Sequence, residues 1–381
     1  MTEELASRGA ALVRGLGRAD AIRWPLLRSA DLFALRYGRA LVEPARRPGT
    51  VPVYGTNGRT GSHDAALFEG PGVVIGRKGV GHLGVEWVKT DFWVIDTAYS
   101  LAIRSDVDLR YAYYLIQHVG LDHLKNGTSN PSLTRDAFGA QLFPIPPRRA
   151  QSAIVTVLGT IDDKIDSNRR LVAEVPLLIR AHVEAALDAE AVEVPVADLA
   201  RFVNGGAYTK GATGSGRMVV RIAELNSGPG PSTVYNEIQV PEDKTTRPGD
   251  ILMSWSGSLG VYRWCLDEAI VNQHIFKVIP SRYPAWLVFD RLEAVIKIFQ
   301  GIAKDKATTM GHIQRGHLEA TRVRIPTVKA IEQLDYQLQP LWDRLLTAEQ
   351  ETLRVLDLRR VLIPELLSGR LLVPESLGAA T

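Results

Sequence analysis

The chain contains little cysteine and histidine, and each shortage excludes a class of site. Cys265 is the single cysteine among 381 residues. A disulfide scaffold, a cysteine-rich zinc site and an iron–sulfur cluster are therefore excluded. The 8 histidines do not fall at the spacings of a zinc-binding motif, so no metal site is expected.

Long apolar runs are also missing. No segment approaches the roughly 18 consecutive apolar residues of a transmembrane helix. Arginines are scattered through the first residues of the chain, where a signal peptide would need an apolar stretch. We therefore expect a cytoplasmic protein.

An excess of charge of one sign is absent as well. The chain has 45 basic and 42 acidic residues, a formal net charge of +3, and 45% of its residues are hydrophobic. This composition supports a buried core and excludes a polycation, so any surface for nucleic acid must be a local patch.

The sequence contains a long internal repeat. Ile145-Pro146 and Ile325-Pro326 lie 180 positions apart, and a long helical pattern follows each pair. Upstream of each pair the chain contains short β patterns and glycine-rich turns in the same order. A repeat of this size is too long for a solenoid and indicates a two-part module that occurs twice.

The two helical patterns have apolar residues at heptad spacing, which predicts an intramolecular antiparallel coiled coil. The alternative is two amphipathic helices that each pack on their own domain. Asn168 and His182 are polar residues on the predicted seam, and we interpret them as register-setting or solvated positions. Pro176 and Pro340 are expected to kink or interrupt the helices. The expected interface residues are Leu158, Ile161, Ile165, Val172, Leu338, Leu341, Leu345 and Val355.

The fold class predicted from these patterns is α/β (α+β) globular domains in two copies, separated by two long helices. The predicted parts are a first globular domain 1–147, a helical spacer 148–190, a second globular domain 191–327 and a second helical region 328–381. The first domain is expected to contain strands at 72–75, 85–88 and 92–95 and a helix at 109–124. The second is expected to contain strands at 217–222, 251–254, 260–264 and 269–279 and a helix at 284–303.

Several segments resemble catalytic motifs but lack the required context. Gly79–Gly84 fits GxGxxG, but a strand pattern follows it where a dinucleotide site needs a helix. Lys210–Arg217 is rich in glycine and lacks the Lys-Ser/Thr ending of a P-loop. Asn130–Leu133 lacks the aromatic residue that an adenine methyltransferase stacks on a flipped base. No catalytic residue is therefore predicted.

Polar loops provide the positive signal, and they suit nucleic acid. Arg, Lys, Asn, Ser and Thr on loops can hold phosphates and hydrogen-bond base edges, and glycine allows close backbone approach. Such residues occur at 77–78 and 125–130, and again at 255–258 and 304–309 in the second copy. Taken singly, each is more often an ordinary solvated turn residue. The candidate DNA-binding residues are Arg59, Arg77, Lys78, His82, Lys125, Ser129, Asn130, Arg135, Lys210, Arg217, Trp255, Ser256, Ser258, His274, Lys306, Thr308, His312 and Arg315.

The sequence resembles the specificity (S) subunit of type I restriction–modification systems over about residues 22–375. The most specific match is Pro-Ile-Pro-Pro at 144–147, followed by Ile-Asp-Asp-Lys-Ile at 161–165 and Asn-Arg-Arg-Leu at 168–171. Val-Tyr-Gly-Thr-Asn-Gly at 53–58 and Leu-Ile-Pro-Glu-Leu-Leu-Ser-Gly at 362–369 add to it.

The resemblance implies two target-recognition domains on an antiparallel helix pair, each recognising one half of a bipartite DNA site. Because the two domains differ in sequence, the site is expected to be asymmetric. The resemblance also implies two docked methyltransferase subunits and, in the full complex, a nuclease/translocase subunit. The chain would be non-catalytic and hold no cofactor, with S-adenosylmethionine in the methyltransferase partner. The alternatives are a stand-alone DNA methyltransferase or nuclease, and a protein-binding structural adaptor.

Overall fold

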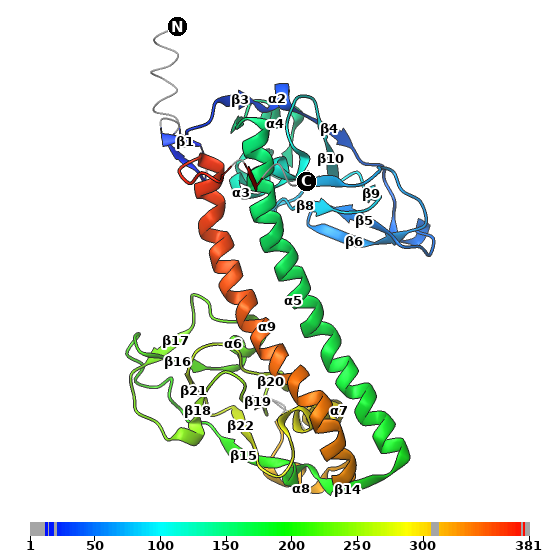
Figure 1. The fold of residues 1–381 in the computed structure, drawn as a ribbon, viewed down its shortest axis with the longest axis vertical. Helices are drawn as coiled ribbons and strands as arrows, with labels where there is room; N and C mark the ends of the chain where they lie inside the picture. The colour runs from blue at the N-terminus through cyan, green and yellow to red at the C-terminus, as the bar shows by residue number, and fades with distance from the viewer. Residues whose placement is uncertain (1–11, 14, 19–20, 306–311, 375, 378–381) are drawn as a thin grey trace. The chain divides into compact units, whose positions relative to one another are not determined.

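The computed structural model describes residues 12–13, 15–18, 21–305, 312–374 and 376–377. Its contacts divide the chain into two compact units. Unit 1 comprises residues 1–163 and 355–381, and unit 2 comprises residues 164–354. Two long helices, α5 (Arg148–Ala189) and α9 (Val328–Ser368), contribute segments to both units (Figure 1).

Unit 1 is built on a four-stranded antiparallel sheet in the order β4-β10-β7-β8. A smaller sheet in the order β6-β5-β9 lies beside it and contains a parallel β5·β9 pair. The core includes buried residues of helix α3, strand β7 and both long helices. The bounds are β4 Phe33–Tyr37, β5 Val51–Gly55, β6 Gly58–His63, β7 Gly72–Gly76, β8 Val85–Val88, β9 Trp93–Val94, β10 Ala98–Ile103 and α3 Leu109–Val119. The shorter elements are β1 Leu12–Val13, β2 Gly17–Arg18, β3 Leu26–Arg28, α2 Ser29–Leu32, β11 Lys125–Asn126, β12 Ser132–Leu133, α4 Arg135–Gly139 and β13 Leu142–Pro144.

Unit 2 repeats this plan. Its antiparallel sheet has the order β15-β22-β19-β20, and its second sheet, β17-β16-β21-β18, contains a parallel β16·β21 pair. The bounds are β15 Ala200–Asn204, β16 Arg217–Val220, β17 Val234–Asn236, β18 Thr245–Thr246, β19 Ile251–Ser254, β20 Gly260–Arg263, β21 Ala269–Val271, β22 Ile275–Pro280 and α7 Ala285–Asp305. The remaining elements are β14 Ala191–Pro195, α6 Ile222–Ser227, α8 Arg315–Ala320 and β23 Arg322–Pro326.

The strand registers confirm the internal repeat. Tyr99 of β10 lies opposite Tyr37 of β4, and Phe276 of β22 lies opposite Asn204 of β15. These four positions therefore correspond between the two units. The predicted fold class, two α/β domains with two long helices, is confirmed.

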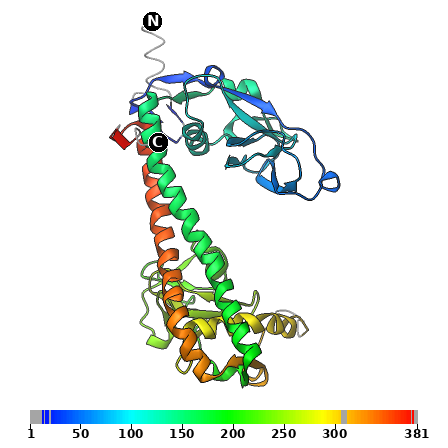
Figure 2. The same cartoon turned by 45° about the vertical axis from the view of Figure 1, so that its right-hand side comes forward.

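The long helices pair antiparallel within each unit. In unit 1, Arg359 Nε of α9 donates to Asp162 Oδ1 of α5 at 2.8 Å. In unit 2, Glu351 of α9 accepts from Asn168 Nδ2 at 3.1 Å and from Lys164 Nζ at 2.9 Å. Residue numbers thus fall along α9 as they rise along α5. Figures 1 and 2 both show the two helix segments side by side.

The predicted interface residues differ in burial. Leu158, Ile161, Ile165, Leu338 and Leu345 are buried, whereas Val172, Leu341 and Val355 are only partly covered.

The heptad prediction is wrong at the C-terminal end of α5. Val183 and Leu187 are buried there, while the predicted seam residue His182 is only partly covered. The reason is the core of unit 2, in which this end of α5 packs with buried residues of α7 and of the β15-β22-β19-β20 sheet as well as with α9. A face that packs on a domain core follows a spacing close to 3.6 rather than 3.5.

Several predicted boundaries also change. Pro176 and Pro340 lie inside α5 and α9 without interrupting them, because a proline removes one helical hydrogen bond while the neighbouring core contacts remain. The helix predicted at 109–124 ends at Val119, because Gly120 takes a positive φ of 68°. The strand predicted at 269–279 is two strands, β21 and β22, which belong to different sheets.

Candidate nucleic-acid interface

In unit 1 the candidate site forms where the loop after β7 meets the start of α4. Leu133 N donates to Arg77 O at 2.8 Å, and Gly79 N donates to Pro131 O at 3.0 Å. Thr134 caps α4 by accepting from Ala137 N at 3.1 Å. These backbone bonds fix Arg77 and Arg135 near each other, although 58 positions separate them in the sequence.

Two guanidinium groups stack on tyrosine rings at this place. The Arg135 Cζ atom lies 4.1 Å from the ring centre of Tyr37, and the Arg77 Cζ atom lies 4.9 Å from the same ring. Arg77 also lies 5.5 Å from the ring centre of Tyr99, which is itself 5.1 Å from Tyr37. Cation–π contacts of this kind hold the guanidinium groups in place while leaving their charge available to an anion. We call Arg77, Arg135, Tyr37 and Tyr99 the guanidinium stack.

Burial affects the two tyrosines differently. Tyr37 is 49% exposed, whereas Tyr99 is buried and its hydroxyl donates to Leu133 O at 3.1 Å. Burial raises the pKa of Tyr99 above its ordinary value. Tyr99 therefore stays neutral and adds no negative charge to the site.

Other predicted residues of unit 1 are engaged with the protein itself. Lys125 is largely buried, and its ammonium donates to Val80 O and Gly81 O at 3.2 and 2.8 Å. Its neighbour Asp122 also bonds His82. Burial opposes ionisation of Asp122, but hydrogen bonds from Leu83 N, His82 and Lys125 outweigh it and hold the Asp122 pKa below its ordinary value. Lys125 and His82 thus fix the conformation of the 80–83 loop.

The remaining predictions in unit 1 lie on exposed segments. Lys78 follows Arg77 and pairs with Asp96, with 3.5 Å between Nζ and Oδ2. Ser129 and Asn130 are exposed in the loop between β11 and β12, and Arg59 is exposed on β6 of the smaller sheet. The structure therefore brings Lys78 beside the guanidinium stack and places Arg59 on a different sheet.

Unit 2 has the same backbone arrangement with different side chains. Ile313 N donates to Trp255 O at 2.9 Å, as Leu133 N does to Arg77 O in unit 1, so Trp255 takes the place of Arg77. The isolated bridges Lys78↔Ser132 and Ser256↔His312 also correspond. Arg315, the first residue of α8, takes the place of Arg135.

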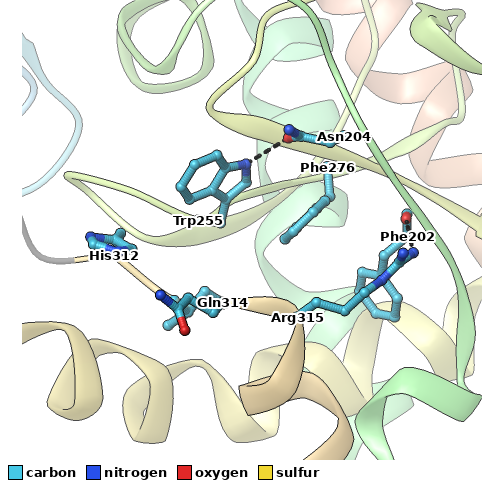
Figure 3. Close-up of a pocket in the computed structure, with 8 residues that line it drawn as sticks. Phe202, Asn204, Trp255, Phe276, His312, Gln314 and Arg315 are labelled. Atoms are coloured by element: carbon cyan, nitrogen blue, oxygen red, sulfur yellow. Dashed lines mark hydrogen bonds between the residues drawn. The ribbon is translucent and has the colours of Figure 1, made fainter.

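These residues of unit 2 surround a cavity of about 480 Å³ (Figure 3). Trp255 and Phe276 form an aromatic wall, with ring centres 6.0 Å apart. Trp255 Nε1 donates to Asn204 Oδ1 at 2.8 Å, and the Arg315 guanidinium donates to Phe202 O at 3.1 Å. The other lining residues are His312, Ile313 and Gln314. We call this the aromatic cavity.

The other predictions in unit 2 have separate environments. Ser256 is buried and hydrogen-bonds His274 at 3.0 Å, so this pair supports the turn that carries Trp255. Arg217 is held by Glu268 at 2.9 Å and by Ile238 O. Ser258 and Lys210 are exposed on turns. Lys306 and Thr308 lie outside the described residues.

Tyr37, Tyr99, Asn204 and Phe276 are site residues that the sequence analysis missed. As apolar or aromatic strand residues, the tyrosines and Phe276 are indistinguishable from core positions by pattern alone. A signal was present in the Tyr37-Gly38 and Asn204-Gly205 pairs, because both glycines end a strand at the same point of the repeat. The β4-β10-β7-β8 sheet of unit 1 and the β15-β22-β19-β20 sheet of unit 2 bring these side chains beside loops that are distant in the sequence.

The glycine-rich segment 79–84 leads into strand β8 and not into a helix, as predicted. Among the described residues, no group of three or more His, Cys, Asp or Glu could hold a metal ion. In the part of the chain that the structure describes, no helix is long and apolar enough to cross a membrane.

The fold and the site define a class of protein in which an α/β domain occurs twice on an antiparallel helix pair, with a surface site at the same place in each copy. Residues 23–177 match the family model described as the type I restriction modification DNA specificity domain. The chain therefore contains a DNA specificity domain of these systems, and the predicted resemblance to their specificity subunits is confirmed. DNA recognition is the role of this domain.

A solved structure supports the fold. The chain is similar to the S subunit of a type I restriction–modification system from M. genitalium, with a TM-score of 0.66 and 15% identity, over 93% of this chain and 99% of that one. An HsdS subunit from Thermoanaerobacter tengcongensis also matches, with a TM-score of 0.33 and 14% identity, over 91% of this chain and 97% of that one. No curated protein matches the chain in sequence.

Proposed function

We propose that this chain recognises a bipartite, asymmetric DNA sequence within a type I restriction–modification complex, with one half-site bound by each unit. The observation that carries this proposal is the duplication of one surface site with different side chains. Unit 1 presents two arginines on tyrosine, whereas unit 2 presents tryptophan, phenylalanine and a single arginine at the corresponding positions. Different side chains on the same backbone frame favour different base sequences.

The chain itself would be non-catalytic in this function. S-adenosylmethionine and the methylation of adenine would belong to the methyltransferase partner, two copies of which would dock on this chain. A nuclease/translocase subunit would complete a restriction complex. The family match over residues 23–177 supports this assignment of roles, because it describes a specificity domain.

The DNA-contacting set that we propose is smaller than the predicted one. Arg77, Lys78 and Arg135 of unit 1 and Trp255 and Arg315 of unit 2 form its centre, because they gather at the duplicated site. Exposed loop residues Ser129, Asn130 and His312 flank these centres. Lys125 and Arg217 have supporting positions instead, since the charged group of each has three partners within the chain. Lys125 contacts Val80 O, Gly81 O and Asp122, and Arg217 contacts Thr245, Glu268 and Ile238 O.

The test combines a methylation map with binding of variants. In cells that carry this chain and its methyltransferase partner, the map should show one asymmetric sequence with two separated adenines. On that duplex, Arg77→Ala and Arg135→Ala should each weaken binding by the complex about tenfold, on the order of 1–3 kcal/mol. If the replaced arginine contacts a phosphate, the slope of the logarithm of the binding constant against the logarithm of the salt concentration should fall in magnitude by about 1. If it contacts a base, sequence specificity should relax at one position of the site.

Arg360→Ala is the matched control, because the Arg360 side chain is 80% exposed on α9 and pairs with Asp357, one helical turn away. The complex that carries Arg360→Ala should bind the mapped duplex with the same affinity as the unchanged complex. Methyl transfer or DNA cleavage by the purified chain alone would contradict the non-catalytic assignment. Binding without sequence preference would contradict the recognition function.

A further inference from the structure

The aromatic cavity of unit 2 has a filled counterpart in unit 1. In unit 1 the centre of the Tyr37 ring lies 4.1 Å from the Arg135 Cζ atom and 5.1 Å from the centre of the Tyr99 ring. The corresponding residues in unit 2 are Asn204, Arg315 and Phe276, and all three line the cavity. Asparagine in place of tyrosine thus removes an aromatic ring that in unit 1 contacts both the guanidinium and the second aromatic ring.

The side chains that line the aromatic cavity determine which ligand can occupy the space of the missing ring. Trp255 and Phe276 offer aromatic surface, and Arg315, Gln314 and Asn204 offer hydrogen-bonding groups around it (Figure 3). The Asn204 amide is oriented by the bond from Trp255 Nε1 to its Oδ1 at 2.8 Å. A flat ring with hydrogen-bonding edges satisfies both features, since stacking uses its faces and the amide and guanidinium groups use its edges.

We propose that the aromatic cavity of unit 2 binds one nucleobase that leaves the stack of the bound DNA, and that the guanidinium stack of unit 1 binds none. This inference rests on the proposed function, because the base comes from DNA already held by unit 2. The volume of about 480 Å³ falls within the roughly 300–1,000 Å³ of small-ligand cavities. Trp255, His312 and Arg315 belong both to the cavity and to the predicted DNA-binding set, so the cavity opens where the duplex is expected.

Mispaired duplexes test the proposal without altering the captured base. The complete complex of this chain and its methyltransferase partner is titrated with duplexes of the mapped sequence. Each duplex carries one mispair, made by changing only one strand. A base that leaves the stack costs less to extrude from a mispair, so binding should tighten about tenfold at one position. That position should lie in one half-site and should differ from the methylated adenines, which the methyltransferase itself extrudes.

A pair of substitutions at Asn204 links the effect to the cavity. Asn204→Tyr restores the ring found in unit 1, so the tightening by the mispair should disappear. Asn204→Ala removes the bond to Trp255 and one hydrogen-bonding group for the base edge but leaves the space. The tightening should therefore be weaker than in the unchanged chain but still present. Both variants must still bind the matched duplex in preference to a scrambled one, which shows that unit 2 is folded.

The outcomes separate this proposal from the proposed function. If the complex binds its sequence specifically but no mispair outside the methylated adenines tightens binding, the nucleobase site is overturned. The proposed DNA recognition is not affected by that result. Equal tightening in Asn204→Tyr and the unchanged chain also overturns it, since the base must then go elsewhere. Loss of all sequence preference in the unchanged complex overturns both.

Discussion

At the scale of single residues, two glycines show most directly that the domains are copies. A Cβ atom on Gly38 would lie 2.1 Å from Ile95 O, and one on Gly205 would lie 2.1 Å from Asn272 O. Each glycine follows the first strand of the antiparallel sheet of its unit and lies against backbone that continues from a strand of the unit's second sheet. Glycine is required at both places because another strand's carbonyl occupies the position of a side chain.

Gly38→Ala and Gly205→Ala should each destabilise the chain by about 1–3 kcal/mol, because the backbone must move to admit a methyl group. Gly81→Ala and Gly230→Ala are the matched controls, since a Cβ atom meets nothing within 4 Å at either position. Urea denaturation followed by tryptophan fluorescence measures the change. Equal stability of the four variants would show that the close backbone approach is unimportant.

Two basic loop residues, Arg77 and Lys125, have different surroundings in the structure. Arg77 and Lys125 are both loop cations in the sequence, but Arg77 stacks on two tyrosines near the surface while Lys125 is largely buried against carbonyl groups. Residue type and loop position predicted both as DNA contacts. Only their neighbours in space distinguish an arginine that stacks on tyrosine rings from a lysine that fixes a loop.

At the scale of elements, the helix pair in unit 2 contains a polar layer. Asn168 is fully buried, and its Nδ2 donates to Glu351, while its Oδ1 has no hydrogen-bond partner. Lys164 reaches the same carboxylate at 2.9 Å. A buried asparagine in a coiled coil lowers stability but favours one register.

Asn168→Leu should therefore raise the free energy of unfolding by about 1 kcal/mol, because a buried oxygen without a partner costs roughly 1–3 kcal/mol. Ser167→Leu is the control at an exposed position of the same helix, and we expect a change within about 0.5 kcal/mol. Urea denaturation of the whole chain compares the two. A less stable Asn168→Leu variant would show that the hydrogen bond to Glu351 outweighs the unpartnered oxygen.

The same polar layer predicts that the stability of the folded chain depends on pH. Hydrogen bonds from Lys164 and then Asn168 hold the pKa of Glu351 below its ordinary value of 4.5. A carboxylate with a lowered folded-state pKa adds stability above its unfolded pKa, and this is lost as the pH falls through the folded value. Wild-type chain should thus be more stable than Glu351→Gln at neutral pH, and the difference should shrink in acid.

Denaturation midpoints measured from neutral pH to below 4.5 provide the test, with Glu332→Gln as an exposed control on α9. The control should follow the wild-type profile. A stability difference between wild type and Glu351→Gln that is constant at all pH values would contradict the ion pair.

At the scale of the whole molecule, one plan occurs twice and the two long helices join the copies in sequence. Helix α5 has 42 residues and α9 has 41. If each unit binds a half-site, the helix lengths should set the number of base pairs between the half-sites. This expectation rests on the proposed function.

Seven residues inserted after Val172 of α5 and seven after Thr347 of α9 keep the heptad pattern and lengthen each helix by about 10 Å. The recognised spacer should then grow by about three base pairs, at roughly 3.4 Å for each. A methylation map of cells carrying the variant measures this. As a control, seven residues inserted in the exposed turn at Gly211 should leave the spacer unchanged. An unchanged spacer in the helix variant would contradict the expectation that helix length sets the spacer.

The sequence by itself determined the duplication, the α/β class and the two helices, because these depend on local periodicity and on the spacing of proline and glycine. It also predicted that Gly79–Gly84 is no dinucleotide motif, since a strand and not a helix follows that segment. Only the tertiary structure decided which face of α5 is buried beyond Val175, because the core of unit 2 and not α9 alone sets that face. It likewise decided the composition of the sites, since Tyr37 and Asn204 meet their partners through strand pairing and loop contacts between residues far apart in the chain.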